Sequence, residues 1–177
     1  LSELLWAMDA TQKSYQRLVA ATDELVKSQF IEMFGNIEKN EKAWPIYRLG
    51  EKAEIGSSKR IFAREYVSSG IPFYRGKEII ELGKGEKPSI ELYISETRYQ
   101  EIKATFGVPQ IGDILMTAVG TIGKFWIVDT DKPFYYKDGN VIYIRANSFE
   151  SLFFKFVLEM LIANYKAKAA NISAYAA

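Results

Sequence analysis

The sequence predicts an α+β fold, in which a long N-terminal helix precedes a domain with an irregular twisted β-sheet and short helices. Two observations support this division. Residues 1–34 contain no glycine or proline, and their apolar residues recur with helical spacing. From residue 44 onward, short apolar runs alternate with glycine and proline, which is typical of short strands joined by tight turns.

The N-terminal segment has the pattern of an amphipathic helix with a heptad seam. At about 1.5 Å per residue such a helix extends roughly 50 Å, which is more than one small domain can cover. We therefore expect a coiled coil with a second helix, and the pair Gly35-Asn36 is a stop signal for the first one. The seam residues expected to make this pairing are Leu4, Met8, Tyr15, Leu18 and Leu25.

The remaining elements follow in order along the chain. We assign residues 1–35 to the helix, 36–43 to a polar linker and 44–177 to the domain, with no function assigned to 166–177. The clearest strands are 114–119 and 124–128, joined by a glycine turn, and 141–145. Ser95 is expected to cap a helix over 96–103, and 149–165 is predicted to be an apolar helix. Trp44 and Trp126 are expected to anchor the core.

Composition removes several classes of function. The chain has no cysteine and no histidine, which excludes disulfide scaffolds, thiolate zinc sites, cysteine nucleophiles and histidine bases. No apolar run approaches the roughly 20 residues of a membrane span, and the start does not resemble a signal peptide. We therefore expect a cytoplasmic protein without membrane contact.

Basic residues concentrate in one stretch of an otherwise balanced chain. The net charge is +1, yet residues 56–77 hold five basic side chains against Glu65 alone. Arginine can bind guanine through two hydrogen bonds, whereas lysine mostly neutralises phosphate. This stretch is a candidate nucleic-acid surface, and a solvated basic loop is the alternative.

Two further patterns have competing interpretations. The segment Gly120–Lys124 could cradle a phosphate, but it lacks the spacing of known phosphate loops, so a tight hairpin turn is the favoured interpretation. Glu91, Glu101 and Lys103 form a crude pattern for a metal-dependent nuclease. Because Glu101 and Lys103 stand two apart on an expected helix, they would not share a face.

A set of short motifs resembles one known family. They are Leu25-Val-Lys-Ser-Gln-Phe-Ile-Glu-Met-Phe-Gly35, Trp44 with Leu49-Gly50, the turn Ile55-Gly-Ser-Ser58, Gly70-Ile-Pro-Phe-Tyr-Arg-Gly76, Gly112-Asp-Ile-Leu-Met116, Gly120-Thr-Ile-Gly123 and Asn140-Val-Ile142. In this order they resemble the specificity subunits of type I restriction-modification systems, over residues 1–165. The match fails at 166–170, where the family usually has a glycine-bearing segment before a final strand that Asn171-Ile-Ser173 only partly resembles.

The resemblance implies a non-catalytic subunit that reads one half of a bipartite DNA site. By analogy, the helix pairs with a second spacer helix of the same subunit or of a dimer mate and sets the spacing. A separate methyltransferase subunit would bring S-adenosylmethionine, a restriction subunit would join, and this chain would bind no cofactor or metal. The implied DNA-binding residues are Ser57, Ser58, Lys59, Arg60, Arg64, Tyr74, Arg75, Lys77, Thr121 and Lys124. The alternatives are a coiled-coil protein-interaction adapter without a DNA role, and the nuclease.

Overall fold

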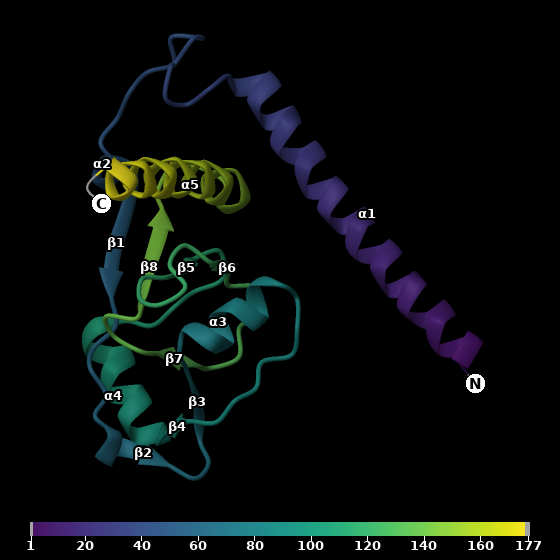
Figure 1. The fold of residues 1–177 in the computed structure, drawn as a ribbon. Helices are drawn as coiled ribbons and strands as arrows, with labels where there is room; N and C mark the ends of the chain where they lie inside the picture. Colours follow the sequence, from purple (N-terminus) through teal and green to yellow (C-terminus); the bar gives the residue numbers. More distant parts are fainter. Residues whose placement is uncertain (1, 176–177) are drawn as a thin grey trace. The chain divides into compact units, whose positions relative to one another are not determined.

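The computed structural model describes residues 2–175, apart from the side chains of residue 168 and residues 170–175. It comprises two compact units, Leu1–Ile46 and Tyr47–Ala177. The predicted α+β class is confirmed: a long helix begins the chain, and strands and short helices follow it (Figure 1).

The first unit is dominated by α1 (Ser2–Phe34), a single uninterrupted helix. The predicted stop is confirmed, because α1 ends one residue before Gly35, whose φ of +81° suits glycine better than any other residue. Phe30 is the buried residue of this helix, whereas the predicted seam is open to solvent along its length within the unit. Leu18 and Leu25, for example, are 62% and 61% exposed.

The segment after α1 folds back and caps the end of the helix. The last carbonyl groups of a helix lack partners within it. Here each of the last four carbonyl oxygens receives a hydrogen bond, and the donors are Gly35 N to Ile31 O (2.7 Å), Lys42 Nζ to Glu32 O (2.8 Å) and Met33 O (2.7 Å), and Trp44 Nε1 to Phe34 O (2.8 Å). Trp44 is 51% exposed, so its expected role as a core anchor is wrong, and it serves as a cap instead.

The second unit contains two small sheets rather than the one irregular sheet expected. The first has the order β1-β8-β5-β6 and is antiparallel throughout. Its strands are β1 (Ala53–Ser57), β5 (Ile114–Thr117), β6 (Phe125–Ile127) and β8 (Val141–Ala146). The second has the order β2-β4-β3-β7 and pairs β3 with β7 in parallel. Its strands are β2 (Tyr66–Val67), β3 (Ile71–Tyr74), β4 (Tyr93–Ile94) and β7 (Tyr135–Tyr136).

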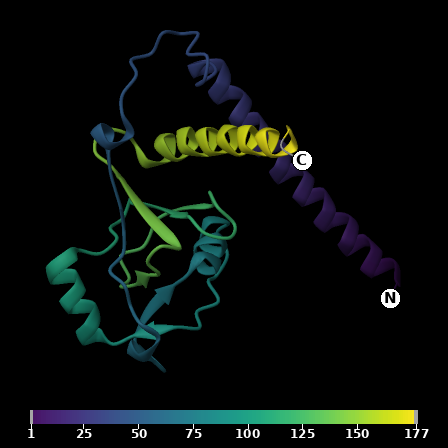
Figure 2. The same ribbon diagram turned by 60° about the vertical axis from the view of Figure 1, so that its left-hand side comes forward.

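Helices cover these sheets. The short ones are α2 (Leu49–Lys52), the 3-10 helix η1 (Ala63–Glu65), α3 (Gly76–Gly83) and α4 (Glu96–Phe106). The long α5 (Ser151–Tyr175) crosses the end of the first sheet in both ribbon views (Figures 1 and 2). Phe154 and Leu158 of α5 pack with Ile114 and Ile144 of that sheet. A second cluster, which includes Trp126, lies around β3 and β7, so the expected burial of Trp126 is confirmed.

Local signals predicted most of these elements. The strands expected at 114–119, 124–128 and 141–145 are β5, β6 and β8, and Ser95 caps α4 by accepting a hydrogen bond from Arg98 N. Helix α5 begins two residues later than expected and continues to Tyr175, so residues 171–173 are helical rather than the entry to a strand.

The turn expected at Ile55–Ser58 is largely wrong. Residues 55–57 belong to β1 and pair with β8. Gly56 is needed there because the Tyr143 ring lies against its backbone: an added Cβ would stand 2.6 Å from Tyr143 Cε1. The glycine therefore makes room for a side chain and does not mark a turn.

Candidate nucleic-acid interface

Four consecutive residues, 57–60, begin at the last residue of β1 and form hydrogen bonds with one distant segment of the chain. We call residues 57–60 together with residues 135–139 the platform. Their contacts are Gly139 N donating to Ser57 Oγ (3.0 Å), Ser58 Oγ donating to Tyr136 O (2.7 Å), Lys59 N donating to Tyr135 Oη (2.6 Å) and Arg60 Nε donating to Asp138 Oδ2 (2.8 Å). Because each residue of 57–60 has a partner, the structure holds this loop in one arrangement.

The platform presents two basic side chains. Lys59 is exposed, with Nζ 5.0 Å from the centre of the Phe106 ring. The Arg60 side chain is 68% exposed, whereas its partner Asp138 is 14% exposed. The hydrogen bond from Arg60 to Asp138 raises the pKa of the Arg60 guanidinium above its ordinary value. Arg64 is also exposed, and its guanidinium carbon lies 4.9 Å from the centre of the Phe62 ring.

A cleft of about 300 Å³ adjoins the platform, and the predicted residues Ser57, Ser58 and Lys59 line part of it. The cleft is also lined by charged and phenolic residues that sequence reasoning did not identify as site residues, among them Glu54, Asp113, Tyr143 and Arg145. Arg145 donates from Nε and Nη2 to the buried carboxylate of Asp113, both at 2.7 Å. Tyr143, on the same strand β8 as Arg145, donates from its hydroxyl to the carboxylate of Glu54 on the neighbouring strand β1. This hydrogen bond, together with burial, raises the pKa of Tyr143 to about 12. Asp113 lies within the motif Gly112–Met116, which was identified from the sequence. No local pattern indicates Arg145, because the two residues of the pair are 32 positions apart.

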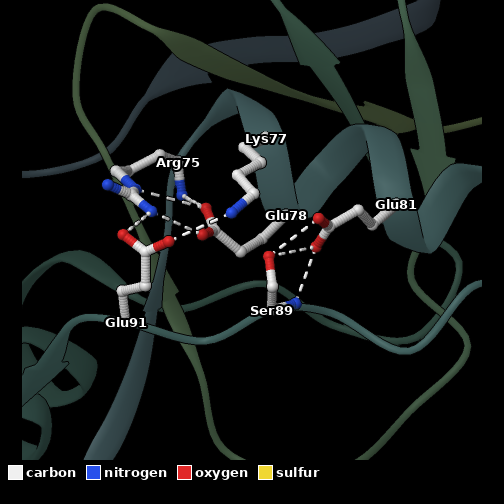
Figure 3. A network of polar contacts seen from close by, with 6 residues as sticks. All are labelled: Arg75, Lys77, Glu78, Glu81, Ser89 and Glu91. Carbon is white, nitrogen blue, oxygen red and sulfur yellow. Dashed lines mark hydrogen bonds and ion pairs between the residues drawn. The ribbon is translucent and has the colours of Figure 1, made fainter.

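The predicted pair Arg75 and Lys77 belongs to a separate ion-pair network (Figure 3). Arg75 Nη2 donates to Glu78 Oε1 and to Glu91 Oε2, both at 2.8 Å, and Lys77 Nζ donates to Glu91 Oε1 at 3.0 Å. The Glu78 side chain is only 1% exposed. The hydrogen bond to Glu78 and the contacts with Glu91 together raise the pKa of Arg75. The carboxylates thus occupy Nε and Nη2 of Arg75, which leaves fewer donors for a nucleic acid.

The Tyr74 ring packs in the core. Its side chain is 8% exposed and its ring stacks on Phe134, with ring centres 5.0 Å apart. Tyr74 ends β3, where the consecutive residues Phe73 and Tyr74 are both buried, so both faces of the strand are covered at this end. Burial of its ring in the core leaves little of Tyr74 accessible for the DNA contact that the resemblance implied.

Thr121 and Lys124 lie in the connection between β5 and β6, as expected of a hairpin turn. Lys124 N donates to Thr117 Oγ1 at 3.0 Å, and Thr117 Oγ1 donates to Thr121 O, so the buried Thr117 closes the turn. Both predicted residues are exposed. Thr121 shares an open hollow with Arg75 and Lys77, which separates it from the platform.

The surface around residues 56–77 is therefore less positive than the sequence of this stretch suggests, because acids from outside the stretch pair with its basic residues. Arg60, Arg75 and Lys77 all pair with acids that lie outside residues 56–77, and two of those acids, Asp138 and Glu91, come from distant segments. Lys59 and Arg64 rest on aromatic rings instead. These two residues and Arg60, whose side chain is 68% exposed, are the most accessible basic groups on the platform side of the stretch.

The carboxylates considered for a nuclease lie in different networks. Glu91 binds Arg75 and Lys77, whereas Glu101 binds Arg98 at 3.0 Å. In the part of the chain that the structure describes, no three acidic side chains gather as a metal site would require. Among residues 2–175 there is also no helix with the length and apolar character needed to cross a bilayer.

Comparison with solved structures defines the fold. The HsdS subunit from Thermoanaerobacter tengcongensis aligns with 88% of this chain and 38% of its own, with a TM-score of 0.55 and 20% identity. A chain of a type I restriction-modification system, solved to explain complex assembly and conformational transition, aligns over the same shares with a TM-score of 0.52 and 18% identity. The chain therefore has the α+β fold of HsdS proteins.

Sequence comparison is more specific. A protein named as a type I restriction enzyme specificity subunit in Haemophilus influenzae is 37% identical over 111 residues, which are 62% of this chain and 26% of that protein. The chain spans about a quarter of the length of this relative. No protein-family model matches the chain. The chain is thus homologous over part of its length to type I restriction-modification specificity subunits, as one target-recognition domain with a helix would be.

Proposed function

We propose that this chain recognises one half of a bipartite DNA site as all or part of a type I specificity subunit. In this proposal residues 1–35 are the spacer helix, 36–43 the linker and 44–177 the recognition domain. The chain carries out no chemistry and binds no cofactor. It acts in the cytoplasm, directing a separate adenine methyltransferase subunit, which holds S-adenosylmethionine, and a restriction subunit. The observation that carries the proposal is the 37% identity to a named specificity subunit, together with the shared fold.

The platform supports this proposal as the DNA-facing surface. A reading surface must hold its side chains in place before DNA arrives, because ordering them on binding lowers affinity. The four contacts of residues 57–60 with 135–139 provide that order. Lys59 and Arg60 project from it, one suited to phosphate and the other to phosphate or a base edge. Arg64, Thr121 and Lys124 are further candidates for contact with phosphate.

The seam of α1 supports the spacer role. Large apolar side chains that are more than half exposed are expected to be covered in the working protein. The five predicted seam residues are between 61% and 66% exposed within their unit: Leu4, Met8, Tyr15, Leu18 and Leu25. We propose that a second spacer helix, from the same subunit or from a dimer mate, covers them. The two recognition domains would then be held at a fixed spacing.

Methylation mapping tests this function. The chain is co-expressed with candidate methyltransferase subunits, and methylated adenines are located across the host DNA. The proposal predicts a motif of two defined parts separated by a fixed number of unread base pairs. If no partner yields adenine methylation above that of the methyltransferase alone, the proposal is rejected.

A salt titration separates DNA reading from a protein-interaction role. Contacts between basic side chains and phosphates release counterions, so affinity for duplex DNA must fall steeply as salt rises. An adapter whose domain binds only protein would show no measurable binding to duplex DNA at low salt. That result would favour the adapter.

A further inference from the structure

We propose that Arg60 reads a guanine in the major groove of the target and that Asp138 holds its guanidinium in position for this contact. The inference rests on the proposed DNA-reading function and deepens it, because it names the base edge and the residue that reads it. It follows from which nitrogen atoms of Arg60 are occupied and which are free.

Asp138 occupies one side of the Arg60 guanidinium and leaves the far end open. The contact is made by Nε, 2.8 Å from Asp138 Oδ2. Within residues 2–175, Nη1 and Nη2 of Arg60 make no hydrogen bond, and the side chain is 68% exposed. The two terminal nitrogens therefore present parallel N–H groups to solvent. Guanine offers a matching pair of acceptors, O6 and N7, at its major-groove edge.

Asp138 is itself held in place, which is what a positioning residue requires. It is mostly buried, at 14% exposed, and stands in the turn whose next residue, Gly139, donates to Ser57 Oγ. The turn is thus tied to the strand that leads to Arg60. A guanidinium fixed at Nε loses less side-chain freedom when its far end binds, which favours a two-point contact over a loose ionic one.

The other arginines of the described chain lack this combination. Arg75 and Arg145 each use Nη2 on a carboxylate, and Arg98 uses Nε for Glu65 and Nη1 for Glu101. In each of these three arginines at least one of the two terminal nitrogens, Nη1 or Nη2, is therefore already bound to a carboxylate. Within the part of the chain that the structure describes, Arg17, Arg48 and Arg64 form no ion pair with a carboxylate that would fix the plane of the guanidinium, and Arg64 lies over the Phe62 ring. Among residues 2–175, Arg60 is the arginine with a carboxylate on Nε and both terminal nitrogens free.

The test replaces single atoms on both sides of the contact. The full chain is assembled with its methyltransferase subunit, and the mapped motif supplies a duplex for competition binding. Each guanine in the half-site read by this domain is replaced in turn by 7-deazaguanine, which lacks the N7 acceptor. At one guanine we expect this to weaken binding of the unaltered complex about tenfold, within the range for loss of a two-point base contact. Arg60→Ala should bind both duplexes equally.

Neighbouring variants serve as controls. Lys59→Ala is expected to lower affinity for every duplex by the same factor and to keep the tenfold effect of 7-deazaguanine, as a phosphate contact would. Asp138→Asn keeps the size of the side chain and removes its charge, and it should reduce the tenfold effect. Retention of the full effect in Asp138→Asn would overturn the positioning role of Asp138.

The outcomes distinguish the inference from the function on which it rests. If the unaltered complex methylates no bipartite motif, the proposed function fails and takes the inference with it. If it does methylate one, the inference alone is overturned by a half-site without a G·C pair. It is equally overturned if Arg60→Ala remains as sensitive to 7-deazaguanine, at every position, as the unaltered complex.

Discussion

Arg75→Ala tests whether Arg75 stabilises the folded domain by pairing with the buried Glu78, a role different from the DNA contact that the sequence suggested. The Glu78 side chain is 1% exposed, and two hydrogen bonds link its carboxylate to the Arg75 guanidinium, at 2.8 and 3.4 Å. Removing one partner of a buried ion pair costs about 3–5 kcal/mol, because the other charge is left unpaired. Arg75 is 30% exposed, and Glu78 keeps a hydrogen bond from Arg75 N, so we expect the lower end, about 3 kcal/mol.

The assay is thermal unfolding followed by circular dichroism or calorimetry. For a unit of this size, about 3 kcal/mol corresponds to a Tm lower by roughly 10 °C. Glu91→Ala is the matched control, because it removes the exposed carboxylate from the same arginine and leaves Glu78 paired. It should change Tm by no more than about 2 °C, as is usual for exposed ion pairs. A Tm for Arg75→Ala equal to that of Glu91→Ala would refute the structural role of Arg75.

Three further outcomes follow from the structure. The pKa of Tyr143 is about 12 in the folded protein, whereas tyrosine in an unfolded chain has a pKa of about 10. The contribution of neutral Tyr143 to stability is therefore fully present below pH 10 and is lost as the pH rises from about 10 to about 12. Phenolate absorbance, compared with Tyr143→Phe, should show this titration, and Glu54→Gln should lower the pKa; an unchanged pKa in Glu54→Gln would contradict the assigned cause. Leu18→Asp combined with Leu25→Asp should abolish association through α1, because burying these charges in an interface costs several kcal/mol. The Tm should stay unchanged, because both residues are exposed in the isolated unit. Sedimentation equilibrium that still shows the assembly would contradict pairing by this seam. Lys42→Ala removes the donor to two carbonyls at the end of α1, so hydrogen exchange in residues 30–34 should become several-fold faster, and unchanged exchange would deny Lys42 a capping role.

Elements that depend on neighbours along the chain could be predicted from the sequence. Gly35 ended α1 because a positive φ was needed there, and Ser95 began α4 because its hydroxyl accepts from the backbone three residues later. Both are interactions within one turn of a helix. Short strands such as β2 and β7, each two residues long, carry no periodic pattern and could not be found in this way.

Only part of the site could be predicted, because distant partners determine which basic residues remain accessible. Arg60 and Arg75 have the same side chain, yet one remains open at its far end and the other is bound by two glutamates. The acid that fixes Arg60 is 78 residues away, a distance at which a single sequence gives no pairing information. Counting charges between 56 and 77 therefore located the platform but overstated its charge. The burial of Tyr74 was also not foreseen, because the sequence did not distinguish a strand from a loop at that position.

A domain exchange tests the central claim most directly. Residues 47–177 replace the corresponding recognition domain of a characterised specificity subunit, and the methylated adenines of the resulting complex are mapped. The account predicts that the half of the motif read by the exchanged domain changes, while the other half and the spacing between them remain those of the parent. A motif identical to that of the parent in both halves, obtained with an assembled and active complex, would contradict the claim that this domain reads DNA sequence.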